Sequence, residues 1–273
     1  MRKFLPALLT VIFSAGVSFA GVLNVGILTQ LNTTRDEFQT FMDGALNAGL
    51  WARHDSGIEG ADTAMFVFYD SLAAMILGLE RGEIDEIDIP ESVGKYILLY
   101  RPEFVAAAES VSRPVFFAMG FRKSDGEELR QNFNAAIKSM KDDGTLAAIT
   151  EKFITGLTTS SESVSFTKFD NAPVIWAAVT GDLPPVDYIN DDGRPSGFNA
   201  ALLAEIGRRL MVNIEILAVN SGARASVLSS KRADVVFCFR VYKWDGSQPD
   251  LPEGIIVSDS YFDWTKYLHI RKK

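Results

Sequence analysis

The chain has 273 residues, 47% of them hydrophobic, which is enough for one large domain or for two lobes with separate cores. Its formal charge of −8 argues against a protein that binds nucleic acid or anionic lipid through electrostatics. The single cysteine, Cys238, excludes an internal disulfide, and the two histidines, His54 and His269, offer no zinc-ligand spacing. We expect neither a metal nor a cofactor.

Residues 1–20 have the features of a secretory signal peptide. Arg2 and Lys3 precede an apolar run at 4–17, and Ser18 and Ala20 are small residues at the positions that a signal peptidase reads. We expect cleavage after Ala20 and export to the periplasm. An uncleaved membrane anchor is the alternative, although the apolar run is short for a membrane span.

The first half of the chain alternates predicted strands with predicted helices. Apolar runs rich in β-branched residues indicate strands at 22–29, 64–69 and 84–89. The helix after each strand begins at a capping residue or a proline, which we place at Thr33 or Thr34, at Asp70 or Ser71, and at Pro90. A strand that runs into a helix N-terminus presents amide donors to an anion such as a carboxylate, although an ordinary capped helix is the simpler interpretation.

Acidic residues gather around the third predicted strand, at Glu83, Asp85, Glu86, Asp88 and Glu91. Their alternation is typical of a solvated strand face, and metal or acid chemistry is the alternative. We keep Asp88 and Glu91 as candidate site residues because they lie at the carboxyl end of that strand.

The middle of the chain contains a predicted strand at 113–121 and two amphipathic helices, separated by Asp143 and Gly144. The Thr- and Ser-rich residues 156–165 follow and have the composition of a linker.

The stretch 179–234 has the order strand, turn, helix, strand, helix, which predicts part of an open α/β sheet. Ligands of such sheets collect at the carboxyl ends of the strands, which places a cleft near 181–188. The next strand carries Arg240, which either faces water or faces the cleft and holds an anion. The later aromatic residues pack in the core or line a pocket: Tyr261, Phe262, Trp264 and Tyr267.

Several of these segments resemble a known family. The segments are 183–210, 229–236 and 257–262 in the second half of the chain, and 22–34, 68–88 and 120–154 in the first half. They are similar to bacterial extracellular solute-binding proteins of the polar amino-acid type. The resemblance implies the α/β, two-lobed periplasmic binding protein-like II fold, in which each lobe is an open mixed sheet flanked by helices.

The order of the segments is reversed relative to that family, which indicates a circular permutation. Residues 21–112 would then form lobe two, 113–155 a return strand and helices that pack mainly with lobe one, 156–165 a linker joining the family's usual ends, and 166–273 lobe one. We expect one covalent crossing between the lobes near 105–115, and we expect residues 269–273 to end near 21–25. Fragments of two unpermuted copies are the rival account.

The resemblance implies a function as well. Family members clamp a small solute between their lobes by hinge closure and deliver it to an ABC permease in the inner membrane. We therefore expect a monomeric carrier of a small polar or anionic solute, such as an amino acid or related carboxylate. The family's ligand-binding arginine, aspartate and aromatic fall at Gly246, Pro90 and Ser221, so Arg240 is the candidate replacement cation.

The candidate ligand-binding residues lie at the predicted strand ends and helix starts: Thr29, Asn32, Thr33, Tyr69, Asp88, Glu91, Thr180, Asp182, Tyr188, Ser221 and Arg240. A binding module for a membrane sensor, with an altered or lost ligand, is the first alternative to transport. A dehydratase-like enzyme on the same scaffold is the second. Such an enzyme would need a general acid and a general base in the cleft. Only the acidic cluster and Tyr188 are available there, and no histidine is well placed, so we expect no catalysis.

Overall fold

The computed structural model describes residues 21–29, 34–47, 61–157, 163–241 and 251–273. Within these ranges it does not describe some side chains, at 45–47, 61–63, 108–114, 221, 238–240 and 265. The predicted signal peptide lies outside the described residues. No helix in the described ranges is long and apolar enough to cross a membrane.

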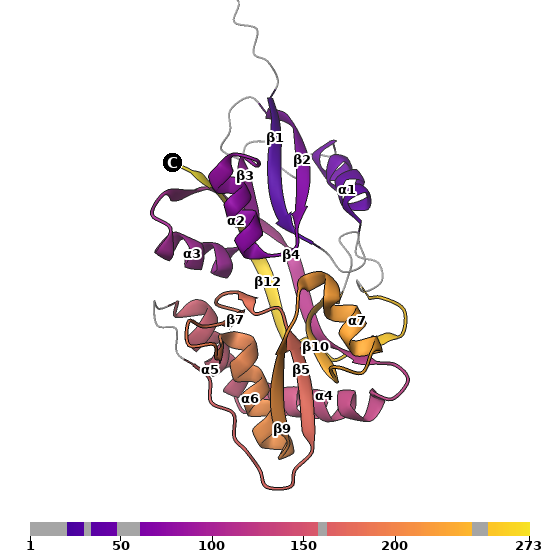
Figure 1. Ribbon diagram of the computed structural model, residues 1–273. Helices are drawn as coiled ribbons and strands as arrows, with labels where there is room; N and C mark the ends of the chain where they lie inside the picture. Colours follow the sequence, from indigo (N-terminus) through magenta and orange to yellow (C-terminus); the bar gives the residue numbers. More distant parts are fainter. Residues whose placement is uncertain (1–20, 30–33, 48–60, 158–162, 242–250) are drawn as a thin grey trace, which may run out of the picture.

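A continuous mixed sheet runs through the molecule in the order β2-β1-β3-β12-β4-β10-β5-β9, with β11 paired to β4. Figure 1 shows β1 to β3 in one lobe and β5, β9 and β10 in the other, with β4 and β12 between them. We call the described residues between 21 and 103 the N-lobe and the described residues between 123 and 261 the C-lobe. The strands are β1 (Gly21–Leu28), β2 (Ala61–Tyr69), β3 (Glu86–Pro90), β4 (Phe104–Arg122), β5 (Val174–Val179), β9 (Asn213–Ala218), β10 (Val235–Arg240), β11 (Ile255–Val257) and β12 (Phe262–Lys272).

In the N-lobe, β1 pairs in parallel with β2 and with β3, and helices cover both faces. Successive strand residues face opposite sides, so Val25 packs in the core under α1 (Arg35–Asn47) while Gly26 lies beside Met75 of α2 (Leu72–Arg81). The sequence signals for α2 are confirmed: the Ser71 side chain accepts a hydrogen bond from the Ala74 amide, and the cap Gly82 has φ 71°. The third helix, α3 (Glu91–Tyr100), begins directly after β3.

In the C-lobe, β5 is parallel to β9 and β10, and β10 is antiparallel to β4. Phe133 and Phe198 of this lobe are fully buried, and the buried ring of Phe121 on β4 packs against Phe133. The helical segments are α4 (Glu127–Asp142), α5 (Thr145–Thr150), the π-helical turn η1 (Glu151–Thr155), α6 (Phe198–Leu210), the 3-10 turn η2 (Ser221–Ala223) and α7 (Arg224–Ser229). A small sheet of β6 (Asp182–Leu183), β7 (Asp187–Ile189) and β8 (Pro195–Ser196) follows β5.

The lobes are connected by two long antiparallel strands, β4 and β12, whose pairing runs from Phe262 opposite Phe117 to Lys272 opposite Phe104. Beyond the C-lobe, β12 also pairs with β3, with His269 opposite Asp88. The expectation of a single crossing near 105–115 is therefore wrong, and the end of the predicted lobe one lies in the N-lobe sheet. The physical reason is that β12 pairs with the backbone N–H and C=O groups at the edge of β3, and that it buries Leu268 and Ile270 in the core.

Candidate ligand-binding region between the lobes

The lobes touch through a backbone-to-carboxylate hydrogen bond. Asp182 follows the end of β5 in the C-lobe, and its Oδ2 accepts from the backbone N–H of Leu72, at the start of α2 in the N-lobe, at 3.1 Å. Burial raises the pKa of Asp182, although the bonds from Leu72 and Thr180 and the charge of Arg224 oppose that shift. The predicted residue Asp182 is thus an interlobe contact that uses a helix N-terminus.

The neighbouring residue Thr180 is held within the C-lobe. Its backbone N–H and hydroxyl both donate to Oδ2 of Asp187, at 3.0 and 3.2 Å. Asp187 is buried, and burial raises its pKa to about 6. These bonds fix the end of β5 and thereby the position of Asp182.

In the N-lobe, the ends of β1 and β2 are joined by Thr29, whose hydroxyl donates to Oδ1 of Asp70 at 2.8 Å. The Tyr69 ring packs instead against α2, where its hydroxyl would contact any side chain placed at Gly78. Tyr69 therefore joins the hydrophobic core at its margin. Its predicted role at the cleft stays a prediction.

A group of tyrosine rings also connects the lobes. Tyr188 on β7 lies 6.1 Å from Tyr96 on α3, and Tyr96 lies 4.7 Å from Tyr100, measured between ring centroids. Burial is the largest cause that raises the pKa of Tyr96 and of Tyr188, so both rings stay neutral at physiological pH. The predicted residue Tyr188 therefore does face the opposite lobe.

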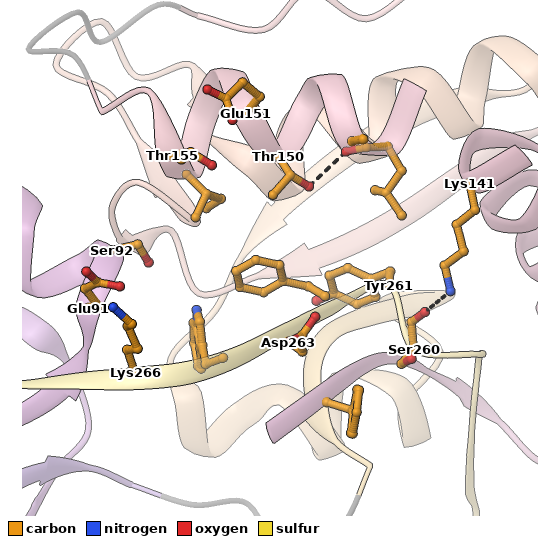
Figure 2. A pocket seen from close by; sticks show the side chains of 16 residues that line it. Glu91, Ser92, Lys141, Thr150, Glu151, Thr155, Ser260, Tyr261, Asp263 and Lys266 are labelled. Carbon is orange, nitrogen blue, oxygen red and sulfur yellow. Dashed lines mark hydrogen bonds between the residues drawn. The ribbon is translucent and has the colours of Figure 1, made fainter. Parts of the chain in front are cut away.

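A cavity of about 670 Å³ lies between α3 of the N-lobe, α5 and η1 of the C-lobe, and the connecting strand β12 (Figure 2). This volume is in the range of small-molecule sites, roughly 300–1,000 Å³. Its apolar wall includes Phe116, Leu146, Ile154, Phe262 and Trp264. The cavity therefore combines a suitable size with surfaces from both lobes.

Charged and polar groups line the rest of the cavity. The carboxylates are those of Glu91, Glu151 and Asp263, and the ammonium groups are those of Lys141 and Lys266. Glu91 pairs with Lys95 one helical turn along α3, and Lys141 donates to the backbone oxygen of Ser260 at 2.7 Å. The lining thus carries charges of both signs.

Two polar atoms of cavity-lining residues, Ser92 Oγ and Trp264 Nε1, are buried and have no hydrogen-bond partner within the described part of the chain. Ser92 itself is only 7% exposed. Buried polar groups in native proteins are nearly always paired, so each of these atoms requires an explanation.

The structure does not gather the predicted site residues in one place. Of those it describes fully, only Glu91 lines the cavity, while Asp182 and Tyr188 contact the opposite lobe without lining the cavity. Asn32 and Thr33 lie outside the described residues. Ser221 begins η2 and Arg240 ends β10 opposite Phe117, and their side chains are not described.

The expectation of a solvated acidic face is wrong for Glu86. This residue is fully buried, and its Oε1 lies 2.7 Å from Nδ1 of His269. Asp88 lies on the same face of β3, and burial raises its pKa to about 6. The alternation of acidic residues suggested a solvated face because it does not show that β12 pairs with β3. That pairing brings His269 next to Glu86. In the described ranges, no group of three or more His, Cys, Asp or Glu side chains could hold a metal ion.

Sequence reasoning did not single out Ser92, Asp187 or Arg224. Arg224 is buried, and its Nη1 donates to the backbone oxygen of Phe237 at 3.3 Å. A signal was available, because Arg224 shares a helix face with the apolar Val227 and Leu228. The later aromatic residues were expected either to pack in the core or to line a pocket, and the structure shows both. Trp264 lines the cavity, whereas Tyr267 is buried and does not line it.

Residues 175–243, which run from β5 to just beyond β10, match the family model described as bacterial extracellular solute-binding proteins, family 3. No curated protein matches the chain.

Solved structures with similarity to this chain include the ligand-binding component of an ABC-type import system from Staphylococcus aureus, with 9% identity, a TM-score of 0.46, and coverage of 92% of this chain and 66% of that one. Another is the binding protein AgaA of A. tumefaciens R10 in complex with agropinic acid, with 12% identity, a TM-score of 0.40, and coverage of 77% and 55%. A third is a putative L-cystine ABC transporter from Listeria monocytogenes, with 12% identity, a TM-score of 0.42, and coverage of 92% and 83%. The chain thus spans less than two thirds of the first two structures.

Proposed function

We propose that this chain, whose residues 175–243 match extracellular solute-binding proteins of family 3, is an exported carrier of a small polar or anionic solute. The carrier clamps the solute between its two lobes in the periplasm and delivers it to an ABC permease. The observation that carries the proposal is the cavity of about 670 Å³ whose lining comes from both lobes.

The connection between the lobes supports this mechanism. β4 and β12 cross side by side between the lobes, so a change in their bend would change the distance between the lobes. The bond between Asp182 and the Leu72 N–H, together with the Tyr96 and Tyr188 rings, would favour the closed arrangement. A ligand that contacts both lobes would shift the equilibrium in the same direction.

A thermal-shift screen of residues 21–273 against amino acids, carboxylates, sugars and polyamines tests the proposal. A ligand at a hundred times its Kd should stabilise the protein by about 2.7 kcal/mol. Small-angle X-ray scattering on each hit should show a smaller radius of gyration with ligand than without. A broad screen without hits, or hits that leave the radius unchanged, would count against the clamp.

Arg240 stays a prediction of this proposal. It ends β10 next to the connecting strand β4, where a guanidinium could hold an anionic group of the solute. The variant Arg240→Ala should weaken the best anionic hit, whereas Arg232→Ala, which removes an exposed arginine before the same strand, should not. An unchanged affinity in Arg240→Ala would remove this residue from the site.

The departures at Gly246, Pro90 and Ser221 keep a second role open, in which the chain delivers a binding signal to a membrane sensor. Uptake of a labelled hit separates the two roles, because only a transport carrier makes uptake depend on this protein. We propose no enzymatic role. The buried carboxylate–imidazole pair of the described chain, Glu86 and His269, lies in the sheet and does not line the cavity.

A further inference from the structure

We propose that the cavity between α3, η1 and β12 binds a small monocarboxylate with an apolar or aromatic body. The carboxylate oxygens would accept hydrogen bonds from the Ser92 hydroxyl and the Trp264 indole N–H. This inference rests on the proposed function and names the class of solute.

The hydrogen-bond chemistry of the two unpartnered groups sets the first requirement. An indole N–H is a donor only, so Trp264 can be satisfied by an acceptor and by nothing else. The Ser92 hydroxyl also donates, and Figure 2 shows it directed from α3 towards the space between η1 and β12. A ligand that serves both groups must therefore present acceptor oxygens, and a carboxylate presents two.

The position of Ser92 in its helix adds a preference for negative charge. Ser92 is the second residue of α3, a helix of 10 residues, and the N-cap Pro90 makes no side-chain capping bond. The free amide groups of a first helical turn attract anions. Glu91 also lies in this turn, but its carboxylate is engaged by Lys95.

The apolar wall of the cavity determines which group can accompany the carboxylate in the ligand. The Phe262 and Trp264 rings meet edge to face, with 5.6 Å between their centroids. With Phe116, Leu146 and Ile154 they form an apolar surface that a planar or branched hydrocarbon body would cover. Three carboxylates line the cavity, those of Glu91, Glu151 and Asp263, against two ammonium groups, those of Lys141 and Lys266. This balance opposes a second negative charge on the ligand, so a monocarboxylate fits better than a dicarboxylate.

Probes that share a phenyl group and differ in charge test the proposed class of solute. Isothermal titration of residues 21–273 should detect binding of phenylacetate, weaker binding of the neutral 2-phenylacetamide and no binding of phenethylamine. Phenylsuccinate, which adds a second carboxylate, should bind more weakly than phenylacetate. Phenethylamine binding as tightly as phenylacetate would overturn the proposal.

Conservative variants test the two donors. Trp264→Phe keeps a smaller aromatic ring and removes the N–H, and Ser92→Ala keeps the approximate volume and removes the hydroxyl. Each should raise the Kd for phenylacetate about tenfold, the equivalent of about 1.4 kcal/mol. Ser92→Ala should not lower the melting temperature of the unliganded protein, because it removes a polar group that has no described partner. Trp264→Phe also loses ring contacts with Phe117 and Phe262 and should lower it moderately. The matched control Trp176→Phe changes an exposed tryptophan on β5 and should leave the Kd unchanged.

The outcomes separate this inference from the proposed function. If the wider screen finds another class of ligand that compacts the protein, and Ser92→Ala and Trp264→Phe leave its affinity unchanged, the carboxylate inference fails and the solute carrier stands. If no probe binds and no hit compacts the protein, both fail. Should Trp264→Phe not fold, Ser92→Ala alone decides.

Discussion

Asp88 is an unusual residue for the middle of a sheet, because its Oδ1 is buried and has no hydrogen-bond partner in the described part of the chain. Burial is the main cause of its pKa of about 6, the neighbouring Glu86 raises that pKa further, and His269 lowers it. An acid whose pKa is raised by folding is held in the protonated form by the fold. It therefore opposes folding increasingly as the pH rises above the ordinary value of 3.8, and this penalty is complete once the pH exceeds the folded-state pKa of about 6.

The variant Asp88→Asn should accordingly stabilise the protein at pH 7.5. A rise in pKa from 3.8 to about 6 corresponds to a penalty of about 3 kcal/mol, and we expect a gain of about 1–3 kcal/mol in the free energy of unfolding. The gain should shrink as the pH falls from about 6 to about 4, because the unfolded wild-type chain also becomes protonated in that window. Urea unfolding at several pH values measures this.

The control for this prediction is Asp192→Asn, at an exposed turn position of the C-lobe. It should change stability little at any of these pH values. A gain in Asp88→Asn that is the same at pH 4 and pH 7.5 would show that ionisation of Asp88 is not the cause.

At the scale of single elements, α1 and α2 offer opposite responses to the same substitution. Gly44 in α1 is exposed, and an added methyl group there would meet nothing within 4 Å. Gly44→Ala should therefore stabilise the protein by about 0.5–1 kcal/mol, since alanine favours the helix. Gly78 in α2 is buried, and a methyl group there would collide with the Tyr69 hydroxyl.

Gly78→Ala should thus destabilise the protein by about 1–3 kcal/mol in spite of its helix propensity. The double variant with Tyr69→Phe removes the colliding hydroxyl and should recover part of this loss. Chemical denaturation of the four proteins provides the measurement. A Gly78→Ala variant as stable as Gly44→Ala would mean that Tyr69 does not pack on α2 as described.

The sequence predicted individual elements well where the signal was local. Ser71 and Gly82 bound α2 as expected, and Asp143 with Gly144 separate α4 from α5. Prediction from the sequence failed where an element depends on a strand that is far away in the sequence. β4 begins at Phe104, well before the predicted 113, since residues 105–112 (VAAAESVS) carry no strong strand pattern and become a strand by pairing with β12. The buried state of Glu86 and the cavity position of Ser92 depend on the same distant strand, which no local pattern could show.

At the scale of the whole molecule, the closed arrangement should depend on Asp182. Asp182→Ala removes the acceptor of the Leu72 N–H and should lower the affinity of any clamped ligand by roughly three- to tenfold, the worth of one hydrogen bond. Scattering of the unliganded variant should show a larger radius of gyration. Asp192→Ala, in a turn of the same lobe, is the control. Unchanged affinity and radius would mean that this bond does not hold the lobes together.

Relinking the chain tests the proposed circular permutation. β12 and β1 flank β3, so the end of β12 lies in the same sheet as the start of β1. A variant that joins Lys273 to Gly21 through a short flexible linker, with new ends at 158–162, would keep every strand pairing. Because the contacts are retained, it should show the same circular dichroism spectrum and bind the same ligands as the parent. The same linker with new ends at 112 and 113 cuts β4 where the lobes connect, and that control should lose stability. If the relinked variant unfolds while the control folds, the permuted relationship is wrong.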